Sequence, residues 1–272
     1  MKKERSLTLL LFALGAVASI VFLLLMKYII FVTIVLIMTH MIYVLKSHSP
    51  VKESSTKLNA CIVICAHSEE KVIKRSIESS INQDYPAMKV VIVDDASTDS
   101  TPEITLEYKK RFPDRVFYLR NERNLKKFSS VIRAFENFDA DVYVFVDADA
   151  EFSENFLSYY MPFMERYHAL IVPVGSYNES KNIITIFHTI EWGLLSTIAI
   201  LNFHLLFHGN GQFVKKEVLQ FIKEYNLLGT DDGAILKGAV KKGHFRFIHP
   251  FGIPLKEYAT ENFKDFVKQR ER

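Results

Sequence analysis

Residues 142–150 read VYVFVDADA, and this stretch decides the fold. Its apolar, β-branched beginning predicts a strand buried on both faces, as in parallel α/β sheets. Asp147 and Asp149 follow at the carboxyl end of that strand, the edge where open α/β sheets bind ligands. Alternation along an extended chain points both carboxylates to one side, where they suit Mg²⁺ or Mn²⁺ carrying a phosphate. A solvated turn explains most D-x-D triplets, so the interpretation depends on the neighbouring segments.

Strands and helices alternate on both sides of this stretch. Further buried strands are predicted at residues 60–66, 90–93 and 116–119. Helices are predicted after Ser68, which can cap the first of them, from Thr101-Pro102, and over residues 127–138. Strands and helices alternating at this spacing predict a doubly wound, mostly parallel sheet.

Polar side chains follow three of the predicted strands. His67, Asp95 and Asp149 each stand just past a carboxyl end, where a buried strand has no need of a polar residue. They are expected to line one crevice suited to a nucleotide and a metal-bound diphosphate.

Charge and cysteine content exclude several classes of protein. The formal net charge of the 272 residues is +3, but the first fifty carry five basic residues and one acidic residue, which leaves −1 for residues 51–272. No basic stripe argues for a nucleic-acid partner. Cys61 and Cys65 lie in one apolar strand and are interpreted as small core residues rather than ligands or a disulfide.

The N-terminal segment predicts a membrane anchor. Residues 7–45 contain one charge, Lys27, and are long enough for two spans, at about 7–25 and 29–45, joined by a tight turn near residues 26–28. Basic residues flank both ends of this hairpin, which places both ends in the cytosol. A cleaved signal peptide ending near residues 16–18 is the rival interpretation, but the apolar run continues well past it. The predicted organisation is a hairpin at 1–46, a linker at 47–58 and a cytosolic catalytic domain at 59–272.

A second apolar stretch, residues 183–206, has one charge, Glu191. A third span there would separate residues 147–149 from residues 231–232 across the membrane. It is therefore interpreted as a buried or interfacial helix near the entry of a lipid or glycan. His204 and His208 have metal-binding spacing but flank apolar residues, and Trp192 is equally compatible with packing or with contact to an acceptor or membrane surface.

Five motifs occur in an order that resembles glycosyltransferase family 2. They are CAHSEE at 65–70, VDDASTDST at 93–101, VDADAEF at 146–152, GNGQFVKKEVL at 209–219 and GTDDGAILKGAVKKGH at 229–244. The resemblance implies inverting enzymes with the Rossmann-like GT-A fold, in the membrane-anchored branch similar to polysaccharide synthases and ceramide glucosyltransferase-like enzymes.

The resemblance also implies roles for individual residues. Asp232 is the expected general base, supported by Asp231, and the metal is expected at Asp149 with Asp147. The donor nucleotide is expected to contact Ala66, His67, Glu69, Asp95, Lys127 and Asp147. The acceptor and diphosphate side is expected to include Gly211, Gln212, Gln269 and Arg272.

Some positions depart from the family pattern. Ser68 replaces the usual Asn, Lys126 the usual Gly, and Asp231 the usual Glu. The chain stops at Arg272, where the Trp of Q-x-x-R-W would follow, which leaves open whether the sequence is truncated or naturally short.

The expected function is transfer of a hexose or N-acetylhexosamine from a nucleotide-diphosphate sugar, with UDP-sugars as the expected donors, to a lipid or growing polysaccharide. The cofactor is expected to be Mg²⁺ or Mn²⁺. A catalytically degenerate member that binds nucleotide sugar or scaffolds a synthase is the alternative. A phosphate-binding receiver module would leave the D-x-D and T-D-D triplets unexplained, and a nucleotidyltransferase would need a Gly-rich loop after the first strand.

Overall fold

The computed structural model describes residues 17, 19, 21–35, 37–38, 56–178, 181–200, 209–225, 232–250 and 252–270. The chain divides into two compact units, Met1–Ser49 and Pro50–Arg272. The predicted α/β domain corresponds to the second unit.

In the first unit, residues 21–35 form one continuous helix. The tight turn predicted near residues 26–28 is therefore wrong, and the physical reason is local: the segment contains no Gly or Pro, and Met26 and Lys27 are good helix formers. Among the described residues, no helix is long and apolar enough to cross a membrane. Much of the predicted hairpin, and most of the linker after it, fall outside the described residues.

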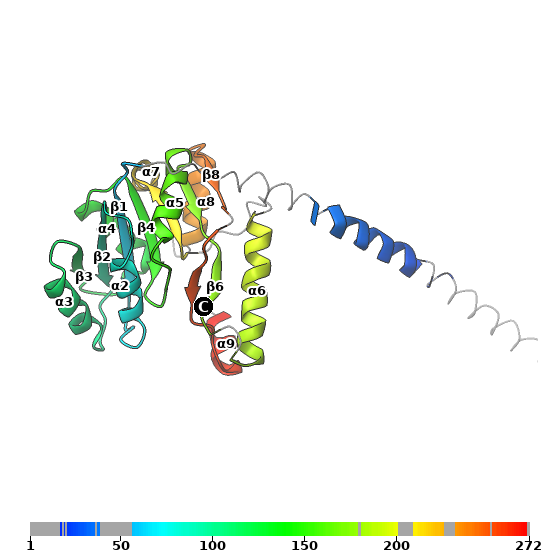
Figure 1. The fold of residues 1–272 in the computed structure, drawn as a ribbon, viewed down its shortest axis with the longest axis horizontal. Coiled ribbons are helices and arrows are strands. Elements are labelled where there is room, and N and C mark those ends of the chain that lie inside the picture. Colours follow the sequence, from blue (N-terminus) through cyan, green and yellow to red (C-terminus); the bar gives the residue numbers. More distant parts are fainter. Residues whose placement is uncertain are drawn as a thin grey trace, which may run out of the picture. The chain divides into compact units, whose positions relative to one another are not determined.

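Four parallel strands form one side of a seven-stranded sheet in the second unit (Figure 1). Their order is β3-β2-β1-β4, with bounds β1 Ala60–Ala66, β2 Met88–Asp94, β3 Val116–Arg120 and β4 Val142–Asp147. Beyond β4 the sheet continues with β7 (Gln212–Lys215), β5 (Ala169–Ile171) and β8 (Phe247–Ile248). β7 runs antiparallel to both of its neighbours, whereas β5 and β8 are parallel. The predicted mostly parallel α/β sheet is thus confirmed.

A second, two-stranded sheet pairs β6 (Val174–Ser176) with β9 (Leu255–Glu257) in parallel. It is tied to the end of β4 because Glu151 and Lys256 form an isolated antiparallel bridge. Segments far apart in the chain, at Glu151 and Lys256, therefore meet directly after the D-x-D triplet.

Helices cover both faces of the main sheet. On one face Ile62 and Ile64 of β1 pack with α2 (Ile73–Ile81), α3 (Thr101–Arg111), α5 (Phe156–Tyr160) and the 3₁₀ helix η1 (Met161–Glu165). On the other face Cys61 and Val63 pack with α4 (Lys127–Asn137), α7 (Lys216–Glu224) and α8 (Asp232–Lys242). Successive strand residues face opposite ways, so burial on both faces explains the unbroken apolar runs.

Cys61 is buried and Cys65 is half-buried in β1, where Sγ of Cys65 donates to the Lys127 carbonyl at 3.8 Å. Burial raises the pKa of the Cys61 thiol to about 12, which makes it an inert core residue. The two remaining helices, α6 (Ile183–Ile200) and α9 (Phe263–Arg270), follow β6 and β9 respectively.

Candidate active site

The turns after β1 and β2 are bonded to each other at the carboxyl edge of the sheet. The Asp95 amide donates to the Ala66 carbonyl at 2.7 Å, and Nδ1 of His67 lies 2.7 Å from the Asp95 carbonyl oxygen. The Ser68 amide donates to Oγ of Ser97 at 2.9 Å. Both turns need a left-handed residue, since φ is 59° at Ser68 and 61° at Ala96. Ser68 therefore does not cap α2 as predicted: the helix begins at Ile73, after a separate turn.

Asp95 is buried and shapes the loop that leads into α4. One carboxylate oxygen accepts hydrogen bonds from Nδ2 of Asn121 at 2.7 Å and from the Leu125 amide at 2.8 Å. The other oxygen accepts from the Lys126 amide at 3.0 Å. The carboxylate thus has a defined partner set within the protein, and its predicted contact with the base or ribose of a nucleotide stays a prediction.

Lys126 has φ of 72° and ψ of 158°, a conformation that favours glycine. This explains physically why the similar family usually carries Gly at this position. Three residues at this edge of the sheet have left-handed backbone conformations although they are not glycine: Ser68, Ala96 and Lys126. Backbone strain of this kind gathers at functional sites.

Asp147, at the end of β4, is paired with Lys127. Nζ of Lys127 donates to Oδ1 of Asp147 and to the Gly209 carbonyl, the latter at 2.7 Å. The Asp147 amide donates to Oδ1 of Asn210 at 2.9 Å, and Oγ of Ser76 donates to the Asp147 carbonyl at 3.1 Å. Three segments of the chain therefore hold Asp147 in place, and one of them contacts its carboxylate through Lys127.

Asp149 lies in a setting that disfavours its ionised form. Burial, together with the charges of Asp147 and Glu69, raises the pKa of its carboxyl group to about 7, against a smaller lowering effect of Lys127. Glu257, at the end of β9, has its pKa raised to about 8 by burial and by the charges of Asp147 and Asp149. Its carboxylate also accepts a hydrogen bond from Nδ2 of Asn210. A divalent cation would relieve this repulsion.

The chemistry of the donor set fits a metal that also binds phosphate oxygens. The described residues include no group of three or more His, Cys, Asp or Glu that could hold a metal ion by itself. Mg²⁺ is commonly held by one or two carboxylates together with water and substrate phosphates, so two aspartates are sufficient. Asp149 is the better placed of the two, because Asp147 is already paired with Lys127.

Gly211 and Gln212 act within the sheet. The Gly211 amide donates to the Phe145 carbonyl at 2.9 Å, its φ is 68°, and a Cβ there would lie 2.5 Å from Cγ2 of Val172. Gln212 is 1% exposed and pairs in register with Phe145 and Ile171. Both residues thus have a structural role beside β4, and their predicted contact with an acceptor stays a prediction.

Other predicted residues lie where their side chains are not described. Asp232 is the first residue of α8, so its backbone stands at a helix N-terminus, where the positive end of the helix dipole favours a carboxylate. Gln269 belongs to α9. Asp231, His204, His208 and Arg272 fall outside the described residues.

Sequence reasoning missed Asn210 and Glu257. Asn210 stands inside the GNGQ motif, where its neighbours attracted attention instead, and it bridges the Asp147 amide to Glu257. Glu257 belongs to a strand of three residues with no motif around it, so nothing local signals its position.

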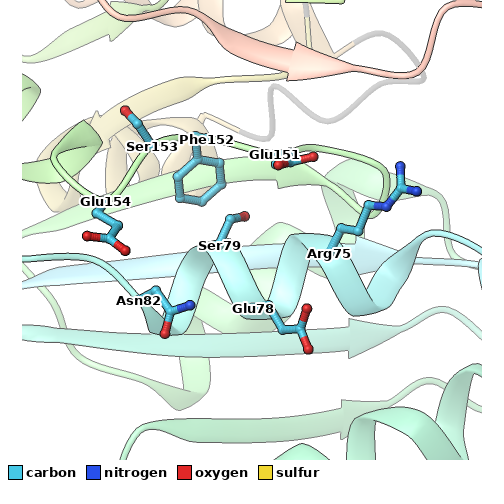
Figure 2. Close-up of a pocket in the computed structure, with 8 residues that line it drawn as sticks. All are labelled: Arg75, Glu78, Ser79, Asn82, Glu151, Phe152, Ser153 and Glu154. Carbon is cyan, nitrogen blue, oxygen red and sulfur yellow. The ribbon is translucent and has the colours of Figure 1, made fainter. Parts of the chain in front are cut away.

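A polar groove with a volume of about 510 Å³ runs between α2 and the segment after the D-x-D triplet. Figure 2 shows Arg75 and Glu151 near one end and Asn82 and Glu154 near the other. The guanidinium of Arg75 lies 5.1 Å from the centre of the Tyr177 ring. Asp147 and Asp149 do not line this groove, so it is separate from the predicted metal site.

Comparison with known proteins agrees with this geometry. Residues 61–226 match the family described as glycosyl transferase family 2, so the class of protein defined by the fold and site is a glycosyltransferase. The chain belongs to that family.

Individual relatives are distant. A β-monoglucosyldiacylglycerol synthase of Nostoc sp. is 28% identical over 176 residues, which are 61% of this chain and 37% of that protein. An uncharacterized glycosyltransferase of Haemophilus influenzae is 28% identical over 118 residues, 43% of this chain and 36% of its own length. The chain thus spans less than half the length of these curated relatives.

Solved structures share the fold. The mannosyltransferase PcManGT from Pyrobaculum calidifontis, in complex with GDP-Man and Mn²⁺, matches with a TM-score of 0.63 at 17% identity, covering 89% of this chain and 71% of that one. S. aureus TarS 1-349 in complex with UDP matches with a TM-score of 0.57 at 17% identity, covering 78% and 63%.

Proposed function

We propose that this protein transfers a hexose or N-acetylhexosamine, with inversion, from a nucleotide-diphosphate sugar to a lipid or a growing polysaccharide. UDP-sugars are the proposed donors, and a divalent cation, Mg²⁺ or Mn²⁺, is the proposed cofactor at Asp149 and Asp147. The catalytic unit is proposed to face the cytosol, held at the membrane by the N-terminal segment.

One observation carries the proposal: Asp149 interacts electrostatically with Asp147, Glu69 and Glu257, and Lys127 pairs with Asp147 beside them. Burial, and after it the repulsion between these carboxylates, raises the pKa of Asp149 and Glu257. A site that gathers negative charge in this way suits a cation bound together with a diphosphate. The complexes of the structural relatives with GDP-Man and Mn²⁺ and with UDP agree with this chemistry.

In the proposed reaction the acceptor hydroxyl oxygen attacks the anomeric carbon as the bond from that carbon to the diphosphate breaks. Asp232 takes the hydroxyl proton as general base, a role worth about 10²–10⁴-fold in rate. The bond's electron pair leaves with the diphosphate, beside which the Lys127 ammonium supplies fixed positive charge. When bound, a divalent cation would supply Lewis-acid stabilisation of that leaving group. Direct attack in one step inverts the anomeric centre.

The donor part of the proposal is tested by thermal unfolding of the detergent-purified chain with UDP, GDP or CMP, each with and without Mn²⁺. A ligand at about 100 times its Kd adds about 2.7 kcal/mol of stability. A rise in melting temperature with one nucleotide, seen only with metal and lost in Asp149→Asn, is expected. The absence of any response to all three nucleotides would contradict it.

The general base is tested separately with Asp232→Asn. This variant should keep donor binding and lose transfer, because the amide cannot accept the hydroxyl proton. Transfer at the parent rate would overturn the assignment. The cytosolic orientation is tested by labelling a single cysteine introduced as Ser54→Cys, and labelling from the non-cytosolic side would refute it.

The second candidate function is a catalytically degenerate family member that binds nucleotide sugar or scaffolds a synthase. The replacement of the usual Glu by Asp231 favours it. Nucleotide binding without transfer to any lipid or glycan acceptor would support this alternative, and measured transfer would exclude it.

A further inference from the structure

Helix α6 exposes several large apolar side chains, and their contact with water is energetically unfavourable. Ile183 is 77% exposed, Ile186 40%, Phe187 54% and Ile190 64%. Their spacing of three, one and three residues places them along one stripe of the helix.

The opposite face of α6 is polar and buried. Thr185 and His188 are buried where the helix packs on β6, and Oγ1 of Thr189 donates to the Thr185 carbonyl at 2.9 Å. Asn182 caps the helix, accepting hydrogen bonds from the Ile184 and Thr185 amides. A helix on the surface of a water-soluble domain buries its apolar side and exposes its polar side, and the described part of α6 does the reverse.

Helix α9 extends the same surface. Phe263 and Val267 are exposed, and the ring of Phe266 lies 5.8 Å from that of Phe187. In Figure 1, α9 lies beside one end of α6. Within the described part of the second unit, six of the nine exposed large hydrophobic side chains belong to these two helices. The set, here called the α6/α9 apolar surface, consists of Ile183, Ile186, Phe187, Ile190, Phe263 and Val267.

Charge around this surface indicates what covers it. Residues 263–272 contain four basic and two acidic residues, and Lys181, at the start of α6, is 60% exposed in an ion pair with Glu261. Apolar side chains with basic neighbours fit the headgroup region of a bilayer that contains anionic lipids. The same chain also carries 39 residues, 7–45, with a single charge. A bilayer therefore explains the surface better than a second copy, which would bring like charges together.

We propose that the α6/α9 apolar surface docks the catalytic unit on a lipid bilayer with anionic headgroups, without crossing it. The surface connects directly to the candidate site: β9 ends at Glu257, and the next residues lead through Glu261 into α9. Nδ2 of Asn178 donates to the Ala259 carbonyl at 2.8 Å, which joins this segment to the one that enters α6. Docking would present the carboxylate edge of the sheet to an acceptor lipid in the membrane. This last step rests on the proposed function, whereas the docking itself does not.

The test uses the full chain in vesicles of phosphatidylcholine and phosphatidylglycerol. An environment-sensitive fluorophore is attached to Ile190→Cys or Phe263→Cys in a Cys65→Ser background, since Cys61 is fully buried. The matched control is Leu106→Cys on α3, another exposed apolar residue on a different helix. We expect nitroxide-labelled lipids to quench the labels at 190 and 263 and aqueous iodide to quench the label at 106.

Iodide quenching at all three positions would overturn the proposal. So would labels at 190 and 263 that neither quencher reaches, because a protein partner would then cover the surface. These readouts need no catalysis, so they are independent of the proposed reaction. In an activity arm, Ile190→Glu should lower transfer to a vesicle-borne lipid and leave donor hydrolysis in detergent unchanged, while Leu106→Glu should alter neither. Equal transfer by Ile190→Glu and the parent would overturn the docking role.

Discussion

Replacing Lys126 with Gly should make the protein more stable, although it removes a side chain. At φ of 72° and ψ of 158°, the Cβ atom of Lys126 clashes with its own backbone. Conformations of this kind cost about 1–3 kcal/mol for a residue other than Gly. Gly costs about 0.5–1 kcal/mol in additional unfolded-state entropy, so the net gain is about 1 kcal/mol.

The contacts at this position survive the change. The amide of residue 126 still donates to the carboxylate of Asp95 and to Oδ1 of Asn124, and the lysine side chain is exposed. In thermal unfolding of the full chain, a gain of 1 kcal/mol corresponds to a rise of about 2–4 °C for a domain of this size.

Lys126→Ala is the matched control, because it removes the same side chain but keeps Cβ. Its stability should stay within about 0.5 kcal/mol of the parent. If Lys126→Gly is no more stable than Lys126→Ala, the strain argument is refuted.

Four other substitutions test the candidate site and the loops and strands that support it. Asp149→Asn, without metal, should raise stability at pH 8 by up to about 4 kcal/mol, the free energy that corresponds to a carboxyl pKa raised from 3.8 to about 7. The pKa of about 7 in the folded protein lies above the ordinary 3.8 of an Asp carboxyl group, so the destabilisation by Asp149 is full above pH 7 and fades as pH falls toward 3.8. A gain that is constant from pH 4 to 8 would contradict this. Gly211→Ala should cost about 2–3 kcal/mol in denaturant unfolding, because φ is positive and Val172 blocks Cβ. Gly238→Ala in α8, where a Cβ meets nothing within 4 Å, should instead gain about 0.5–1 kcal/mol, and equal effects would refute the packing argument. Asp95→Ala should cost about 3 kcal/mol, since two amides and Asn121 lose a charged acceptor, and a loss under 1 kcal/mol would show that the loop holds without it.

The central sheet could be predicted because the sequence of each of its strands carries a local signal. The runs at 60–66 and 142–147 are apolar at every position up to their ends, which only burial on both faces explains. The placement of Asp147 and Asp149 at the carboxyl edge could likewise be predicted, because the ends of parallel strands meet at one edge, whereas Lys127 was expected there only from the family resemblance. The predictions that were wrong concern local backbone geometry, which is determined by tertiary contacts. Ser68 is a strong capping residue by propensity, but its amide bonds to Ser97 across the neighbouring turn, and it takes a left-handed conformation instead.

Long-range pairing explains the residues that were missed. Glu257 reaches the carboxylate cluster only because β9 pairs with β6 across 80 residues and because Lys256 bridges Glu151. A strand of three residues is too short for a periodic pattern, so its sequence carries no signal of that position. The exposure of Ile190 could not be predicted from the sequence either, because an apolar run has the same composition whether it packs in a core or faces a bilayer.

Strain and charge repulsion coincide at one edge of the sheet, and this coincidence distinguishes a site that binds a nucleotide and a metal from a scaffold that binds neither. Ser68, Ala96 and Lys126 hold left-handed conformations there, and Asp149 is held near the negative charges of Asp147 and Glu69. Each feature lowers the stability of the ligand-free protein, so each needs a compensating role if the site works. A bound metal and diphosphate would offset the repulsion, and only an active or nucleotide-binding site gains from that. Asp149→Asn should therefore gain stability without ligand and lose the response to nucleotide with Mn²⁺ in the same preparation. A variant that gains stability while the parent itself responds to no nucleotide would instead identify the edge as the remnant of a site.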